Sequence, residues 1–207
     1  MRDDSVIAEK KRRGARRRAR TRADILSAAR EVFAERGYHD ASIAEIAERA
    51  DIAVGTFYLY FHDKDEAFTT LLNEGFEDAR KRVMEAVATQ EPDGPTLPVV
   101  IQAILQHAYE QRSLFRIALT GGRQFTSTSP VQTAIAEIIA EVLEDAHKQA
   151  ALIGYDLPIL TSLLTGMITQ AIAWWFEHDT PDPDAMTNQL VRVLQHGLPA
   201  HVFTSQP

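Results

Sequence analysis

The 207-residue sequence contains no cysteine, which excludes disulfide bonds and cysteine nucleophiles. It has no glycine-rich phosphate loop after a strand and neither of the hydrolase motifs HExxH and GxSxG. The seven histidines are scattered, and His147 with Glu144 is more typical of an exposed helix face than of a metal site. We therefore expect no metal, no cofactor and no catalytic residue, and an enzyme is the disfavoured alternative.

No apolar run follows the first basic residues, so we expect no secretory signal and a cytoplasmic location, nucleoid-associated when bound to DNA. The most apolar stretch, residues 157–176, is long enough to cross a membrane. It is interrupted by polar residues such as Thr165, Thr169 and Gln170, and it ends in charged ones. A helix buried between subunits explains this pattern better than a membrane span.

The net charge of −7 is unevenly distributed. Residues 1–62 carry thirteen Lys or Arg against ten Asp or Glu, or +3, and residues 63–207 carry nine against nineteen, or −10. An acidic body with a basic N-terminal part suits a protein that presents one end to a polyanion.

Residues 42–64 carry the strongest pattern, that of two short helices joined by a tight turn. Ser42 followed by Glu45 forms a capping box, and Ile46 belongs to an apolar stripe at helical spacing. Asp51 stands at the turn, where a residue that tolerates the left-handed conformation is expected. A second helix starts near residue 54 and is anchored by Phe57 and, four residues later, by a further phenylalanine. Two short helices at a steep angle predict a helix-turn-helix, whose second helix fits a DNA major groove.

The outer side of this second helix is poor in charge. Val54 and Leu59 can contact thymine methyl groups, and Tyr58 and Tyr60 offer hydroxyls to phosphates. Gly55 costs about 1 kcal/mol in a helix relative to Ala, which suggests that a phosphate approaches the backbone closely.

The segment resembles the DNA-binding motif of the TetR family of bacterial transcriptional regulators. The matching residues are Ser42-Ile43, Ile46-Ala47, Ala50, Gly55-Thr56-Phe57-Tyr58, Tyr60-Phe61, Asp63-Lys64-Asp65 and Phe68. Three features depart from the family pattern: Asp51 replaces Gly, Ala53 replaces a Ser cap, and Val54 and Leu59 replace polar residues.

Residues 1–20 are predicted to form a basic, disordered arm. Nine Lys and Arg lie within positions 10–22 with no acid among them, and like charges at this density resist compact folding. The arm is either a solvated tail or a DNA-contacting element. From the residues and the resemblance together, the expected DNA contacts are Arg20, Arg22, Ser42, Val54, Gly55, Thr56, Tyr58, Leu59, Tyr60 and Lys64.

Helical periodicity with Gly and Pro breaks predicts about nine helices and no strand. The expected ranges are 21–36, 42–50, 54–61, 63–89, 98–111, 114–120, 130–153, 157–178 and 184–196. The chain is thus predicted to be all-α, with an arm (1–20), a three-helix helix-turn-helix domain (21–66), a larger helical effector-binding and dimerisation domain (67–200) and a tail (201–207).

A single recognition helix reads few base pairs, so we expect a homodimer on a pseudo-palindromic operator. The last two helices supply more apolar stripes than one core requires, and the family pairs such helices in a four-helix interface. The expected interface residues are Leu160, Leu164, Met167, Ile168, Ala171, Trp175, Leu190, Val193 and Leu194.

The resemblance also implies that a small molecule in the larger domain releases the protein from DNA, as a repressor. Aromatic residues with a few polar points would suit a hydrophobic or amphipathic ligand. The expected pocket residues are Phe68, Phe76, His107, Tyr109, Phe115, Arg116, Arg123, Gln170 and Trp174; the alternative for each aromatic one is a place in the core. Two further alternatives stay open: a non-specific DNA-coating protein, and a helical small-molecule-binding or scaffold protein without DNA specificity.

Overall fold

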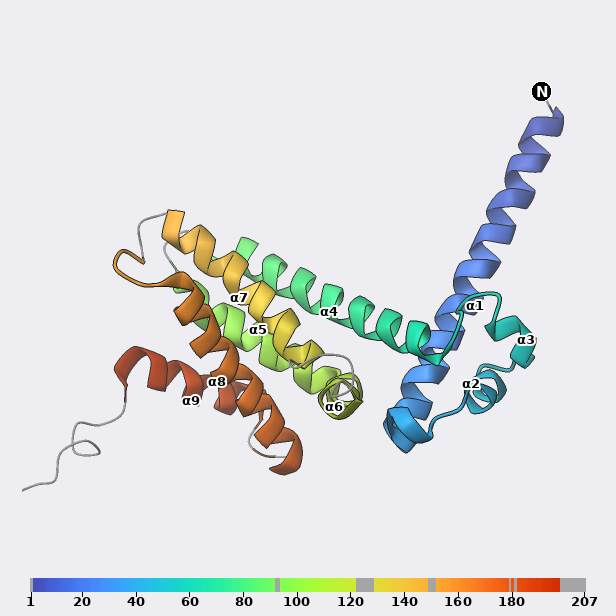
Figure 1. The fold of residues 1–207 in the computed structure, drawn as a ribbon. Coiled ribbons are helices and arrows are strands. Elements are labelled where there is room, and N and C mark those ends of the chain that lie inside the picture. The colour runs from blue at the N-terminus through green and yellow to red at the C-terminus, as the bar shows by residue number, and fades with distance from the viewer. Residues whose placement is uncertain are drawn as a thin grey trace, which may run out of the picture. The chain divides into compact units, whose positions relative to one another are not determined.

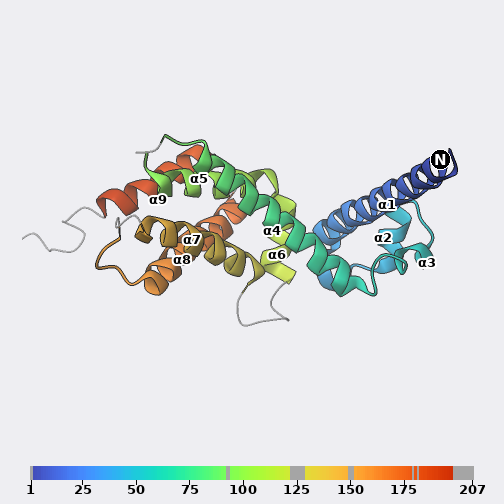
Figure 2. The ribbon, with the colours of Figure 1, turned by 90° about the horizontal axis from the view of Figure 1, so that it is seen from above.

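The computed structural model describes residues 2–91, 94–121, 129–148, 152–178, 180 and 182–197. Every regular element among these residues is a helix, in agreement with the predicted all-α class (Figures 1 and 2). The helices are α1 (Arg2–Asp40), α2 (Ile43–Arg49), α3 (Val54–Phe57), α4 (Lys64–Ala88), α5 (Thr96–Glu110), α6 (Arg112–Gly121), α7 (Pro130–Lys148), α8 (Leu157–His178) and α9 (Pro183–His196). The expected loop over residues 121–129 and the tail 201–207 fall largely outside the described residues.

The chain divides into two compact units, residues 1–74 and 75–207. The division falls inside α4, a little beyond the boundary expected at residue 66. Unit 1 contains the helix-turn-helix and unit 2 contains α5 to α9.

The core of unit 1 forms where α1 meets α2, α3 and the start of α4. Ile25, Ala29 and Phe33 form the predicted apolar stripe of α1 and are buried with Ile46 and Phe57. Helix α4 starts where its cap was expected, because the Asp63 carboxylate accepts a hydrogen bond from the Glu66 amide at 2.8 Å.

Helix α1 differs from the expectation of a disordered arm over residues 1–20. The helix begins at Arg2, and its first non-helical residue is Gly37, with φ 77° and ψ 167°. Arg, Lys and Ala are strong helix formers, and this segment continues a helix that is already nucleated by a buried stripe. These terms outweigh the charge repulsion on which the expectation of disorder rested.

The core of unit 2 is built around α5, whose Ile101, Ile104 and Leu105 are buried. Helix α7 packs along α8, and α5 packs along α9 (Figure 1). Helix α8 is long and apolar enough to cross a membrane by length and composition alone, but one side of it is buried against these neighbours.

Candidate functional site

The turn between α2 and α3 has the expected geometry. Asp51 has a positive φ of 54°, and among the described residues it is the one non-glycine residue with this conformation. Helix α3 starts at Val54 and is capped by Ala53 without any side-chain hydrogen bond. The Asp51 turn allows α3 to leave α2 abruptly, and the helix depends on packing rather than on a cap for its position.

Packing holds the inner side of α3 and leaves the outer side free. Phe57 and Phe61 are buried with ring centroids 5.7 Å apart. On the outer side Tyr58 is 54% exposed and Leu59 is 81% exposed, and Val54 is also exposed. The segment thus presents a mostly apolar surface to solvent, which is unusual for a surface with no ligand.

Three further expected contacts lie on the same segment. Gly55 is exposed, and a Cβ atom built there would meet nothing within 4 Å. Packing within the chain therefore does not require a glycine at this position, which leaves close approach from outside as its use. Thr56 and Tyr60 are half-buried at the edges of this surface.

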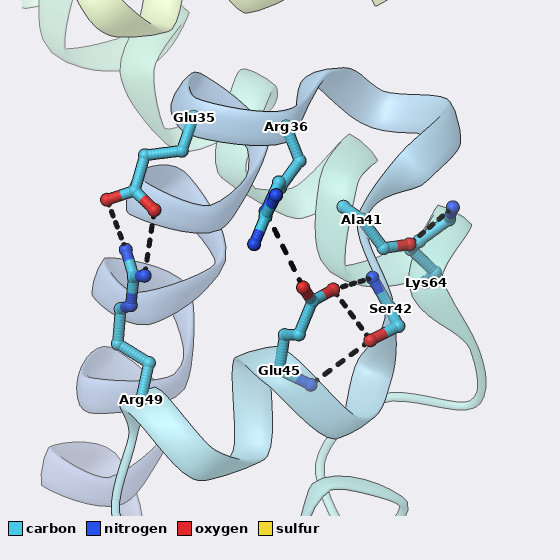
Figure 3. Close-up of polar contacts among 7 residues, drawn as sticks. All are labelled: Glu35, Arg36, Ala41, Ser42, Glu45, Arg49 and Lys64. Carbon is cyan, nitrogen blue, oxygen red and sulfur yellow. Dashed lines mark hydrogen bonds and ion pairs between the residues drawn. The ribbon is translucent and has the colours of Figure 1, made fainter.

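Ser42 forms the predicted capping box at the start of α2 (Figure 3). Its Oγ accepts a hydrogen bond from the Glu45 amide at 3.2 Å and donates to Glu45 Oε2 at 2.8 Å. The same carboxylate accepts from the Ser42 amide at 3.0 Å, and these bonds lower the pKa of Glu45. The hydroxyl proton of Ser42 is therefore used within the cap, and a phosphate would have to displace Glu45 to receive it.

Lys64 has a structural position that the sequence did not reveal. Its Nζ donates to the carbonyl oxygen of Ala41 at 2.9 Å (Figure 3). It also donates to the carbonyl oxygens of Tyr38 at 2.7 Å and His39 at 3.2 Å, and lies 4.6 Å from the Tyr38 ring centroid. An ammonium has three protons, so all of its donors are occupied. Its expected role as a DNA contact is corrected: Lys64 ties α4 to the end of α1.

The two arginines expected to contact DNA differ in their surroundings. Arg20 is exposed on α1. Arg22 forms an ion pair with Glu74 at 2.5 Å, and its guanidinium lies 5.6 Å from the Phe61 ring centroid. Arg22 thus links α1 to α4 within unit 1, and its guanidinium is still exposed, so its assignment as a DNA contact stays a prediction.

An ion pair between α1 and α2 was not anticipated. Arg49 donates to the two carboxylate oxygens of Glu35 at 2.6 and 2.8 Å (Figure 3). This hydrogen bonding lowers the pKa of Glu35 and raises that of Arg49. The bidentate geometry fixes how α2 sits on α1, although an exposed pair of this kind stabilises a protein by less than about 1 kcal/mol.

The expected effector-pocket residues do not form one group. Phe68 is a core residue of unit 1, with its ring centroid 5.3 Å from that of Phe33, so its assignment to the pocket is wrong. Arg123 lies outside the described residues. Most of the remaining residues divide between a buried cluster and an open groove in unit 2, and Tyr109 stacks on Trp175 outside both.

The buried cluster joins α4, α5, α6 and α8. The Phe115 ring centroid lies 6.3 Å from that of Phe76, 5.9 Å from that of His107 and 6.4 Å from that of Phe176. At the edge of this cluster, Arg116 donates to the Phe176 carbonyl at 3.3 Å. The cluster brings three expected pocket residues, Phe76, His107 and Phe115, into one apolar region.

His107 is the polar group inside this cluster. Its side chain is 1% exposed, and neither ring nitrogen makes a hydrogen bond of good geometry to the described residues, although a contact with the Gly75 backbone raises its pKa. Burial, with a smaller effect of Arg82, lowers the pKa of His107, while Asp78 at 3.8 Å acts in the opposite direction. A buried unpaired polar group costs about 1–3 kcal/mol, so this is a position where a ligand group could be bound favourably.

The open groove lies between α8 and α9. It has a volume of about 460 Å³ and an almost entirely apolar lining of Met167, Gln170, Ala171, Trp174, Met186, Gln189 and Leu190. Gln170 and Trp174 were expected in the effector pocket, whereas Met167, Ala171 and Leu190 were expected in the dimer interface. The structure places these five residues on one surface.

Some expected interface residues face inward instead. Leu164, Ile168 and Trp175 are buried within unit 2, and the Tyr109 ring stacks on Trp175 with centroids 5.3 Å apart. Their assignment to a dimer interface is wrong, because the side of α8 that they occupy packs on its own unit. Tyr109, expected in the pocket, covers that side.

The opposite side of α8 remains open. Ile159, Leu163 and Trp174 are 60%, 61% and 43% exposed, and Val193 on α9 is also exposed. Leu160 and Leu194, both expected in the interface, are half-buried. Ile159 and Leu163 were not among the expected contacts; they are the apolar residues of α8 left over once its inward side is assigned.

Comparisons with known proteins agree with the geometry of unit 1. Residues 25–69, which span the C-terminal part of α1, α2, α3 and the start of α4, match the model described as bacterial regulatory proteins, tetR family. The matched segment contains the exposed surface of α3.

Full-length relatives cover both units. The fatty acid metabolism regulator protein of Bacillus subtilis is 26% identical over 183 residues, which are 84% of this chain and 93% of that protein. The transcriptional activator FasR of Mycolicibacterium smegmatis is 25% identical over 187 residues, covering 87% and 84%. The crystal structure of FadR from Bacillus subtilis in complex with stearoyl-CoA has the same fold, with a TM-score of 0.75, 24% identity and coverage of 86% and 99%.

Proposed function

We propose that this chain, a member of the TetR family of bacterial regulatory proteins, represses transcription by occupying an operator as a homodimer and leaves the DNA when an amphipathic effector binds unit 2. The chain is a DNA-binding transcriptional regulator with a helix-turn-helix. The observation that carries the proposal is the exposed outer side of α3, where Tyr58 and Leu59 face solvent while Phe57 is buried.

The apolar character of this surface indicates how it reads DNA. Val54 and Leu59 would contact thymine methyl groups in the major groove, and the Tyr58 hydroxyl would bind a phosphate. With little charge on α3, most of the specificity comes from shape and apolar contact. We therefore expect A·T-rich half-sites, arranged with twofold symmetry.

The dimer would form through the open side of α8 and α9. The exposed apolar side chains of these helices, among them Leu163, Trp174 and Val193, are costly to leave in water. A second copy of the same surface is the partner that the proposed twofold operator requires. The dimer would bring two α3 segments to one duplex in the bacterial cytoplasm.

For the effector we propose a long acyl chain carried as a coenzyme A thioester. The relatives include a fatty acid metabolism regulator and a regulator crystallised with stearoyl-CoA. The chemistry of unit 2 suits such a molecule, because the cluster of Phe76, Phe115 and Phe176 is apolar and contains a single buried polar group, His107. Differential affinity of the ligand for the two states would then shift the DNA equilibrium.

The test begins with selection of bound sequences from random DNA, followed by titration of the selected duplex with stearoyl-CoA. We expect a pseudo-palindromic site and loss of binding at micromolar ligand, with free coenzyme A as the control. Tyr58→Ala should lower operator affinity by at least about tenfold and leave dimerisation and the tryptophan response to ligand unchanged. Selection of no common sequence would contradict the regulator assignment, whereas a site that persists at all ligand concentrations would contradict only the effector class.

A further inference from the structure

The helical segment of residues 9–20 in α1 packs on none of the described parts of unit 1. All residues from Glu9 to Arg20 are exposed. Eight of them, from Lys10 to Arg20, are Lys or Arg, and the one acid, Glu9, forms an exposed ion pair with Arg13 at 3.3 Å. An exposed pair of this kind leaves nearly all of the positive charge available.

The arrangement of charge around this helix limits what it can bind. At about 100° per residue, the eight cations point in every direction around the helix axis. The only apolar side chains among residues 9–20 are Ala15 and Ala19. There is no apolar stripe for a lipid surface or a partner helix, so the partner must be a polyanion.

The charge density matches that of duplex DNA. Eight cations over eleven helical residues give about one positive charge per 2 Å of helix. B-DNA carries one negative charge per about 1.7 Å of its axis. The cations on the side of the helix that faces the duplex can therefore pair with phosphates, with release of condensed counterions.

The direction of this helix is fixed relative to the recognition segment. The same α1 carries Ile25, Ala29 and Phe33 into the core of unit 1, and no non-helical residue occurs before Gly37. In both views of the ribbon its N-terminal half runs out beyond α2 and α3 (Figures 1 and 2). The basic helix is therefore held at a set angle and does not have to be ordered separately when DNA binds.

We propose that the helix of residues 9–20 binds the phosphate backbone of duplex DNA that flanks the operator half-site read by α3. The inference rests on the proposed function, since α3 must first place unit 1 on DNA. It differs from the action of a flexible basic tail, because the helical form is what directs the charges to the flank. The contact is independent of base sequence and depends strongly on salt.

Gly14 provides a test that leaves the charge unchanged. It lies in the middle of the basic helix, and a Cβ atom there would meet nothing within 4 Å. Gly14→Ala strengthens the helix, whereas Gly14→Pro breaks it, and neither change reaches the core. A third variant replaces the eight Lys and Arg by Gln and keeps helix-forming residues throughout.

The full-length protein would be titrated against two duplexes that share the selected operator. One duplex ends at the operator, and the other continues for about 10 base pairs of random sequence on each side. We expect the flanks to raise the affinity of the wild-type protein by roughly tenfold or more at low salt and to steepen its salt dependence. Gly14→Ala should keep or increase this gain, Gly14→Pro should reduce it at least several-fold, and the Gln variant should abolish it.

Affinity for the short duplex should be nearly equal for all four proteins, and circular dichroism would verify the change in helix content. An equal gain for Gly14→Pro and wild type would overturn the helical mechanism, and no gain for the wild type would overturn the flank contact itself. Tighter binding by the Gln variant would show that the helix interacts with acidic parts of its own protein instead. Absence of binding to either duplex would count against the proposed function rather than against this inference.

Discussion

At the scale of single residues, side chains that the sequence motif groups together have different surroundings. Tyr58 and Leu59 are exposed, whereas Lys64 uses all of its donors on backbone carbonyls. A sequence motif assigned all three to DNA. The structural role of Lys64 becomes visible only when the carbonyl groups at the end of α1 are located, and long-range packing sets their position.

Replacing Lys64 by Met is expected to lower the free energy of unfolding by about 1–3 kcal/mol, because carbonyl groups at the end of α1 lose a charged donor. The slope of log affinity against log salt should stay unchanged. Denaturant titration and DNA binding at several salt concentrations measure the two quantities. Arg20→Met is the matched control, with unchanged stability and a salt slope smaller by about 1 if this exposed arginine contacts phosphate. A smaller salt slope in the Lys64 variant would restore it as a DNA contact.

His107 predicts a pH dependence of stability. Burial lowers its pKa in the folded protein below the ordinary value of 6.5, and Asp78, Arg82 and Glu110 are the charged groups around it. As pH falls below 6.5 the unfolded chain binds a proton that the folded chain does not. His107 therefore does not reduce the free energy of unfolding above pH 6.5, and this free energy declines as the pH falls toward the lowered pKa.

His107→Phe should remove this decline and should leave stability at pH 7.5 unchanged or higher, because an unpaired buried polar group is lost. Thermal unfolding between pH 5 and 7.5 measures the effect. His147, exposed on α7, supplies the control variant His147→Gln, which should keep the wild-type profile. A parallel loss of stability in the Phe variant would mean that His107 has a partner.

At the scale of elements, local signals predicted where most helices start and stop. The Ser42–Glu45 capping box, the Asp63 cap and the Gly197 stop all lie where they were expected. These signals depend on neighbours in sequence, which is why they can be identified without a structure. The prediction of disorder for the basic part of α1 was wrong, because this part depends on residues farther along the chain. Its helix is stabilised by the buried apolar stripe that follows it.

The packing of one helix against another depends on close contacts between them that the sequence does not reveal. Gly75 lies where α4 meets α6, and a Cβ atom there would overlap with Leu114 Cδ2. Leu114 is fully buried, so it has little room to move. The contact explains a glycine in the middle of a long helix, at a cost of about 1 kcal/mol relative to Ala.

Gly75→Ala is expected to destabilise the protein by about 1–3 kcal/mol through overpacking. The double variant Gly75→Ala/Leu114→Ala should be more stable than the sum of the two single changes predicts, because the added methyl group fills part of the space that is vacated. Denaturant titration of all three proteins measures the coupling. Gly55→Ala, whose Cβ meets open space, should not destabilise the fold. Strict additivity would show that the two positions do not compete for volume.

At the scale of the whole molecule, the exposed apolar side of α8 is the feature on which the proposed homodimer depends. Periodicity predicted an interface on these helices, but it could not tell which side of α8 faces its own core. Leu164, Ile168 and Trp175 face inward, and Leu163 and Trp174 face outward. In an almost uniformly apolar helix, the sequence does not indicate which side faces the core, because packing against neighbouring helices determines the orientation.

Leu163→Glu is expected to weaken the dimer about 100-fold or more, since a carboxylate without a partner would be buried at the interface. Operator affinity should fall with it. Sedimentation equilibrium over a range of concentrations and binding to the selected duplex measure both effects. Gln132→Glu adds the same charge to an exposed position on α7 and should leave assembly intact. A Leu163 variant that remains dimeric would place the interface elsewhere.

The division of the chain at residue 74 falls within the continuous helix α4, which runs from Lys64 to Ala88. Anyone who grafts the DNA-reading part of this protein onto the sensing part of a relative must therefore splice inside a helix. Inserting or omitting one residue at that splice would turn the grafted part by about 100° and move it about 1.5 Å along the axis. Chimaeric regulators built from this chain should work when the junction preserves the number of residues in α4. They should fail when one or two residues are inserted or omitted there.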